Sequence, residues 1–136
     1  MGLDYYYKNE ADKYSFIRIP KAMMTEELFA SLSIQAKILY GLLLDKLGEA
    51  SKNKWIDDEN KVYVIYPITE IMDDMNVSKG KAVGSLSELE NIGLVEKHPR
   101  GMGQPSLLYV KNFVVTANMI IKKRISKMHI TNCVCE

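Results

Sequence analysis

Two helical patterns separated by a two-residue break place the strongest constraint on how this chain can fold. The first pattern covers Glu70 to Met75, and Thr69 can cap it. The second runs from the cap residue Ser78 to about Asn91, and Asn76-Val77 makes the break between the two. The sequence therefore predicts two helices joined by a tight turn.

The second of these helices leads into two β-prone runs. Gly93 is placed to end the helix, and the runs Leu94 to Lys97 and Leu107 to Val110 follow, joined by the loop His98 to Ser106. A helix, a turn, a helix and a β-hairpin in this order predict an α+β fold, the winged helix-turn-helix. The predicted buried face of the second helix comprises Ala82, Val83, Leu86 and Leu89, which repeat at helical spacing.

An additional strand and helix precede this unit. Tyr14 to Ile19 predicts a short edge strand that Pro20 ends. Lys21 to Ser31 predicts a short helix, and Ser33 then caps a longer helix that Gly48 stops. The predicted core-facing stripe of the longer helix comprises Ile34, Ile38, Leu39, Leu42, Leu43 and Leu47, with Lys37, Asp45 and Lys46 mostly off it.

A β-hairpin is predicted between the longer helix and the helix pair. Its arms are Trp55-Ile56 and Val62 to Tyr66, and Pro67 closes it. The turn between the arms contains Asn60, which tolerates left-handed backbone.

The length and composition indicate one domain with short additions. A chain of 136 residues that is 47% hydrophobic can enclose a modest core. We expect an N-terminal arm at 1–13, the winged-helix domain at 14–113, and a basic amphipathic tail or linker at 114–136. No apolar run approaches the roughly 20 residues of a membrane span, so we expect a cytoplasmic protein without membrane association.

The formal net charge of +1 hides an uneven distribution. The middle of the chain is acidic and the segment after it is basic, so a near-neutral total is compatible with a basic face. The acidic residues are Asp57, Asp58, Glu59, Glu70, Asp73 and Asp74, and the basic ones are Lys79, Lys81, Lys97, Arg100 and Lys111.

This basic segment predicts a DNA-binding surface. The second helix of a helix-turn-helix presents its N-terminal residues to base edges in the major groove. Lysines there can bind phosphates or guanine, glycines let the backbone approach, and an arginine at the tip of the wing suits a narrow minor groove. The same lysines in isolation would be ordinary solvated side chains, and their position in the motif favours DNA contact. The candidate DNA-binding residues are Ser78, Lys79, Gly80, Lys81, Gly84, Ser85, Lys97, His98, Arg100 and Gln104.

Catalytic and metal sites have little support in the sequence. There is no glycine-rich phosphate loop and no cysteine and histidine pattern typical of a nucleophilic site, so we expect no enzyme activity and no cofactor. His129, Cys133 and Cys135 could supply part of a metal site, but tetrahedral zinc needs a fourth ligand. We therefore predict no metal.

From about Phe16 to Phe113 the chain resembles the N-terminal domain of the RepA-type replication initiators of Gram-positive plasmids, the staphylococcal members in particular. The order and combination of the motifs are specific, although each is weak alone. They are Phe16-Ile-Arg-Ile-Pro-Lys21, Leu32-Ser33, Ala36-Lys37, Leu39-Tyr40, Leu42-Leu43-Leu44-Asp45, Trp55, Asp57, Val62-Tyr63, Glu70-Ile71, Ser78, Lys81-Ala82, Glu88-Leu89-Glu90, Gly93-Leu94, Arg100-Gly101, Gly103, Pro105 and Tyr109-Val-Lys-Asn-Phe113.

The resemblance implies a protein that binds repeated double-stranded DNA sites in a plasmid origin, starts replication and controls copy number. It implies a recognition helix at Ser78 to Asn91, a wing at Pro99 to Ser106, and host replication proteins bound through a separate C-terminal region. The stretch after Phe113 has no counterpart that we can align, and we expect a chain of this length to be a truncated initiator or a fragment without that C-terminal domain.

The exposed N-terminal arm and strand could be completed by a second copy, so we expect a homodimer or a higher assembly on DNA. Two other functions remain open on this fold: a winged-helix transcriptional regulator, and a winged helix that binds proteins during replication.

Overall fold

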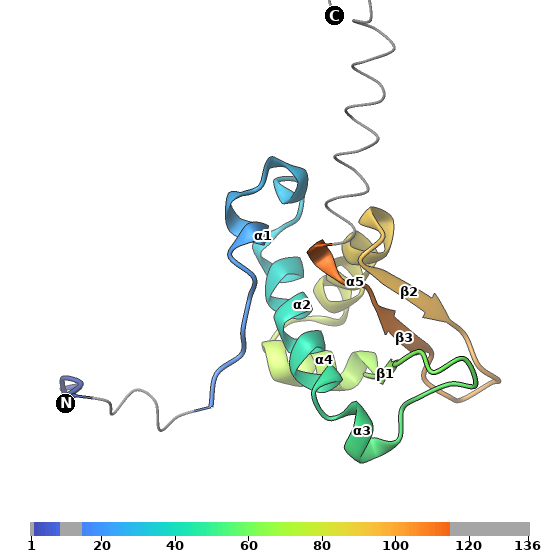
Figure 1. Ribbon diagram of the computed structural model, residues 1–136. Helices are drawn as coiled ribbons and strands as arrows, with labels where there is room; N and C mark the ends of the chain where they lie inside the picture. Colours follow the sequence, from blue (N-terminus) through green and yellow to red (C-terminus); the bar gives the residue numbers. More distant parts are fainter. Residues whose placement is uncertain (1, 9–14, 115–136) are drawn as a thin grey trace, which may run out of the picture.

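A computed structural model describes residues 2–8 and 15–114 and confirms the winged-helix architecture (Figure 1). The three longest helices pack around one core, to which shorter helices also contribute, and a three-stranded antiparallel sheet in the order β1-β3-β2 lies beside them. The elements are α1 (Ala22–Thr25), the 3₁₀ helix η2 (Glu27–Phe29), α2 (Ile34–Leu47), α3 (Ala50–Asn53), β1 (Val64–Ile65), α4 (Ile68–Met75), α5 (Lys79–Ile92), β2 (Val95–His98) and β3 (Leu107–Val110).

Helix α2 forms the centre of the core. It begins where expected, because the Oγ of Ser33 accepts a hydrogen bond from the backbone N–H of Ala36 at 3.1 Å. Its buried side is rotated from the predicted stripe: Ile34 is 58% exposed, whereas Lys37 is only 8% exposed. Packing partners set this rotation, and the core-facing residues are Ala36, Leu39, Tyr40 and Leu43, with Leu42, Leu44 and Leu47 partly buried.

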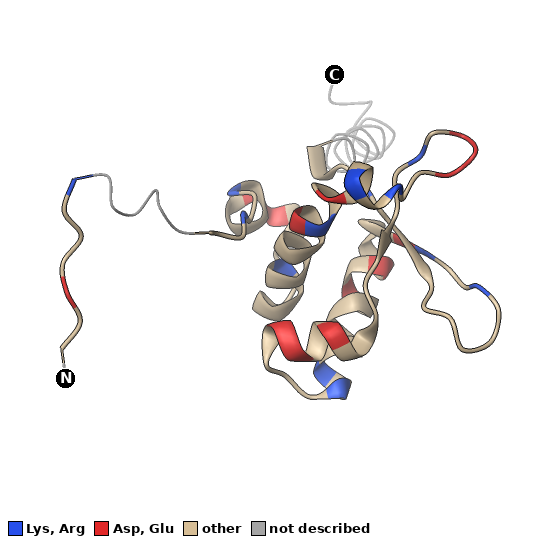
Figure 2. Ribbon diagram, turned by 90° about the horizontal axis from the view of Figure 1, so that it is seen from below, with Lys and Arg blue, Asp and Glu red and all other residues tan. Residues whose placement is uncertain are grey.

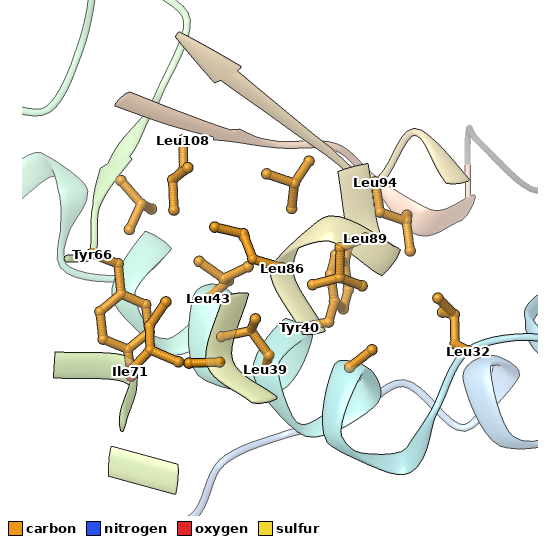
Figure 3. Packing of buried hydrophobic residues seen from close by; sticks show 14 of the residues in the cluster. Leu32, Leu39, Tyr40, Leu43, Tyr66, Ile71, Leu86, Leu89, Leu94 and Leu108 are labelled. Carbon is orange, nitrogen blue, oxygen red and sulfur yellow. The ribbon is translucent and has the colours of Figure 1, made fainter. Parts of the chain in front are cut away.

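The core joins α2 to the helix-turn-helix and the sheet (Figure 3). Ile71 comes from α4, Leu86 and Leu89 from α5, and Leu108 from β3. Burying each such side chain contributes about 1.5–3 kcal/mol. The core therefore fixes α4, α5 and the wing against the same central helix.

The predicted strand at Tyr14 to Ile19 is wrong over the part that the structure describes, because Ser15 to Ile19 has no strand pairing. This segment lies instead against α2 at Gly41. A Cβ built on Gly41 would come within 2.9 Å of Ile19 Cγ1 and 3.1 Å of the Arg18 carbonyl oxygen, so only glycine permits the approach. After it, α1 and η2 replace the single helix that was predicted.

The predicted hairpin is present only in part. Ile56 and Val62 form one isolated antiparallel bridge. The rest of the second arm becomes β1, which pairs with β3 so that Val64 lies opposite Leu108. Asn60 has the expected left-handed backbone, with φ of 65°.

Helix α4 begins immediately after Pro67, two residues earlier than a cap at Thr69 would allow, so that predicted cap is wrong. The turn to α5 contains Asn76 in a left-handed conformation (φ 54°), and Gly93 ends α5 with φ of 91°. Within residues 2–8 and 15–114, no helix has both the length and the apolar character that crossing a membrane requires.

Candidate nucleic-acid interface

The start of α5 is an exposed, positively charged helix end. Ser78 caps the helix in extended conformation, and its Oγ accepts a hydrogen bond from the backbone N–H of Lys81 at 3.3 Å. Lys79, Gly80 and Lys81 are all exposed. Among the described residues, neither lysine has an ion-pair partner. Both ammonium groups are therefore available to a ligand.

The outer surface of α5 lacks side chains at two successive turns. A Cβ built on Gly84 would have no neighbour within 4 Å, and one built on Gly80 would meet only the Ser78 Oγ at 4.0 Å. Neither glycine is thus required by packing within the protein. Their effect is to leave helix backbone open to close approach by a large partner.

The buried side of α5 differs from the predicted one at two positions. Ser85 was predicted to lie on the flank of the helix and to contact DNA. Its side chain is only 3% exposed, so the predicted placement is wrong. Val83, predicted as buried, is 42% exposed. Contacts with α2 and α4 rotate the helix so that Ala82, Ser85, Leu86 and Leu89 face inward.

A carboxylate that the sequence analysis did not single out holds α5 against α2. Glu88 accepts two hydrogen bonds from Ser33, one from the backbone N–H and one from the hydroxyl, both at 2.7 Å. The Ser33 Oγ in turn accepts from Ala36. One side chain thus fixes the relative rotation of α5 and the N-terminus of α2. A Ser-x-x-Ala start and a distant glutamate give no local signal of this pairing.

The wing places Lys97 beside α5. Val95 is buried, and because side chains alternate along a strand, Lys97 lies on the same face of β2. A groove of about 340 Å³ separates the wing from the helices, lined by residues that include Leu86, Lys97 and Gln104. Lys97 and Gln104 therefore lie next to Leu86 of α5, as expected for two residues of the predicted DNA-binding surface.

The tip of the wing is a tight glycine turn. Gly103 has φ of 79°, and the backbone N–H of Gln104 donates to the carbonyl of Gly101 at 3.2 Å. The Nε of Arg100 donates to the Pro105 carbonyl at 2.8 Å. This bond ties the guanidinium to the turn, while its terminal nitrogens have neither a hydrogen-bond nor an ion-pair partner among the described residues.

His98 lies on the opposite face of the sheet from Lys97, and the structure does not bring it together with α5. Its Nε2 is bonded to Glu96, and its ring lies 4.7 Å from that of Tyr109. Bonds from His98 and Lys111 hold the pKa of Glu96 below its ordinary value. The structure thus places His98 apart from the candidates on α5, and its contact with DNA stays a prediction.

Basic residues occur at both parts of the candidate DNA-binding surface, the start of α5 and the wing, although acidic residues lie close by (Figure 2). Blue residues mark the start of α5 and the wing, whereas red residues lie on α4 and in the turn at 57–59. Asp57 serves that turn: its carboxylate accepts from the backbone of Glu59 and Lys61 and from the Tyr109 hydroxyl. These bonds, that of Lys61 foremost, lower the pKa of Asp57. The Asp57 carboxylate thus serves its own turn and Tyr109.

Comparison with known proteins decides the family. The model of the family "Replication initiator protein A (RepA) N-terminus" matches residues 15–123. The chain belongs to this family. The match continues ten residues beyond Phe113, so the expectation that no counterpart exists after that residue is wrong.

Three solved structures resemble this RepA N-terminal chain. One is described as the N-terminal domain of a DNA-binding protein (30% identity, TM-score 0.67, 90% of this chain and 96% of that chain covered). A Rep–DNA complex is 33% identical with a TM-score of 0.67, covering 80% of this chain and 84% of the other. An MDR initiator is 30% identical with a TM-score of 0.64, covering 89% and 98%.

A curated relative indicates the size that such proteins can have. A 41 kDa protein of Lactobacillus helveticus is 27% identical over 81 residues. The match covers 60% of the RepA N-terminal chain but only 23% of that protein, so this chain spans less than a quarter of the relative's length.

Two sequence-based expectations fall on residues that the structure does not describe. The tail after 114 and its His129, Cys133 and Cys135 lie outside the described residues, as do residue 1 and residues 9–14 of the arm and its junction with the domain. Within residues 2–8 and 15–114, no group of three or more histidine, cysteine, aspartate or glutamate side chains could hold a metal ion.

Proposed function

We propose that this chain binds double-stranded DNA at repeated sites in a plasmid origin, and thereby takes part in starting replication and controlling copy number. The observation that carries the proposal is the exposed lysine pair at the start of α5, which has no ion-pair partner among the described residues, together with a wing that presents further cations. The similarity to a Rep–DNA complex at 33% identity supports it.

In this mechanism α5 enters the major groove through its N-terminal end. Lys79 and Lys81 bind phosphates or guanine, and the N–H groups of the first turn add a phosphate site. Gly80 and Gly84 let the helix backbone lie close to the bases, while Arg100 reaches the adjacent minor groove from the wing. Lys97 and Gln104, which line the groove beside Leu86 of α5, add further polar contacts. Binding needs no catalysis, metal or cofactor.

Assembly on repeated sites is part of the same proposal. Phe16 and Ile17 expose apolar surface beside α2, and Leu3, Tyr5 and Tyr6 are exposed further towards the N-terminus. A second copy that covers these groups would give a homodimer. Host replication proteins would bind a region outside this chain. Since plasmids replicate in the cytoplasm, the proposed function places the protein there.

The test begins with selection of bound duplexes from a random-sequence DNA library. Affinity for the recovered site is then measured over a salt series by fluorescence anisotropy. The double substitution Lys79→Ala, Lys81→Ala should weaken binding and reduce the salt slope by up to about 2, since each phosphate contact contributes about 0.9. Circular dichroism checks that the variant is folded.

The matched control removes two exposed lysines from elsewhere, by Lys21→Ala with Lys52→Ala. It changes the net charge equally and should leave the salt slope nearly unchanged. Equal losses in both variants, or unchanged affinity after loss of Lys79 and Lys81, would contradict the proposed interface. Tandem copies of the recovered site in an origin support initiation, whereas a single palindrome near a promoter would favour transcriptional regulation.

A further inference from the structure

Val83 is an apolar side chain on the surface that the proposed function assigns to DNA. It is 42% exposed and lies one helical turn after Lys79 on the same side of α5. Leu86, one turn further on, lines the groove between α5 and the wing. Val83 therefore faces the side on which the wing lies.

The fold does not account for valine at this position. A β-branched residue is a weaker helix former than alanine, and Val83 belongs neither to the buried core cluster nor to the partly buried hydrophobic residues packed against it. Its neighbours Gly80 and Gly84 carry no side chain. The isopropyl group consequently projects beyond the bare backbone beside it and is the apolar group that a partner approaching this side of α5 would meet.

Base edges in the major groove differ in chemistry, and thymine contributes an apolar group there, its C5 methyl. The remaining groups that identify bases are hydrogen-bond donors and acceptors, which a valine side chain cannot bind. We propose that Val83 contacts the C5 methyl of one thymine in each bound site and so favours thymine at that position. This inference rests on the proposed function and adds a specificity-determining residue to it.

A uracil scan tests the contact. In the duplex recovered by selection, each thymine is replaced singly by deoxyuridine, which removes the C5 methyl and keeps base pairing. At one thymine of each site, affinity of the full chain should fall about four-fold, the loss expected for one buried methyl group. With Val83→Ala, the same replacement should change affinity less than about two-fold, because the methyl has lost its partner.

Val62→Ala is the control, since Val62 is an exposed valine in the hairpin, away from α5. This variant should keep the full effect of deoxyuridine. A scan in which no thymine methyl affects wild-type binding overturns the inference, as does an effect that persists unchanged in Val83→Ala. If the chain binds no duplex at all, both the proposed function and this inference fail. If the chain binds tightly but no deoxyuridine replacement changes its affinity, only this inference fails.

Discussion

Replacing Gly84 by alanine should raise stability and lower DNA affinity, two effects of opposite sign. Gly84 lies inside α5 with an open surround, since an added Cβ has no neighbour within 4 Å. Alanine is favoured over glycine within a helix by about 0.5–1 kcal/mol. For a domain of this size, that gain corresponds to a melting temperature higher by roughly 2–8 °C.

The loss of affinity follows from close approach of the backbone to DNA. A methyl group inserted into a fitted contact costs about 1–3 kcal/mol, which corresponds to a dissociation constant roughly 5- to 160-fold higher. Thermal unfolding followed by circular dichroism measures the first effect. Fluorescence anisotropy with the selected duplex measures the second.

Ser51→Ala provides a control, because Ser51 is an exposed helical residue of α3 and not of α5. It should change DNA affinity by less than about two-fold, within the scatter expected for a surface substitution. Unchanged DNA affinity in Gly84→Ala would refute close approach of the α5 backbone to DNA. A lower melting temperature would refute the finding that an alanine side chain at position 84 has room.

Three further predictions concern the frame that supports α5. Glu88→Ala should lower the free energy of unfolding by about 1–3 kcal/mol in urea, because two Ser33 donors lose their acceptor, and Glu88→Gln should lose less. Burial raises the pKa of Tyr40 from 10.0 to about 12, so the stability that the protonated phenol contributes below pH 10 is lost as the pH rises towards 12. Tyr40→Phe should flatten this decline in unfolding free energy. The variant should also lose about 1 kcal/mol of stability, because it lacks the hydrogen bond to the Lys111 carbonyl. The pKa of Asp57 is lowered from 3.8, so the unfolding free energy of the wild type should fall as the pH drops below about 4. The unfolding free energy of Asp57→Asn should fall less over the same range, and equal acid dependence in both proteins would contradict this prediction.

Sequence reasoning located the ends of elements better than their rotation. Ser33 and Ser78 cap helices and Gly93 ends one as expected, because a cap depends on residues within one turn. The buried faces of α2 and α5 depend instead on which neighbours pack against them. Ile34 and Val83 were therefore expected inside and lie outside.

The candidate site was predictable to a similar degree. Lys79 and Lys81 are exposed at the start of α5, as expected from its cap. Strand alternation could have separated Lys97 from His98, since adjacent residues of a strand face opposite sides. The bond from Ser33 to Glu88 joins residues 55 positions apart, and no local pattern indicates such a contact.

The division of α5 into a packed side and an outer side has a consequence for how DNA preference can change. Ala82, Leu86 and Leu89 hold the helix through burial, and Glu88 fixes its rotation. Val83 and the other outer residues belong to neither the core nor that bond, so substitutions among them cost little stability. We therefore expect that exchanging outer residues of α5 alters which duplex is selected while the unfolding free energy stays within about 1 kcal/mol. Exchanging Glu88 should do the reverse, weakening binding to all duplexes alike because it loosens the whole helix.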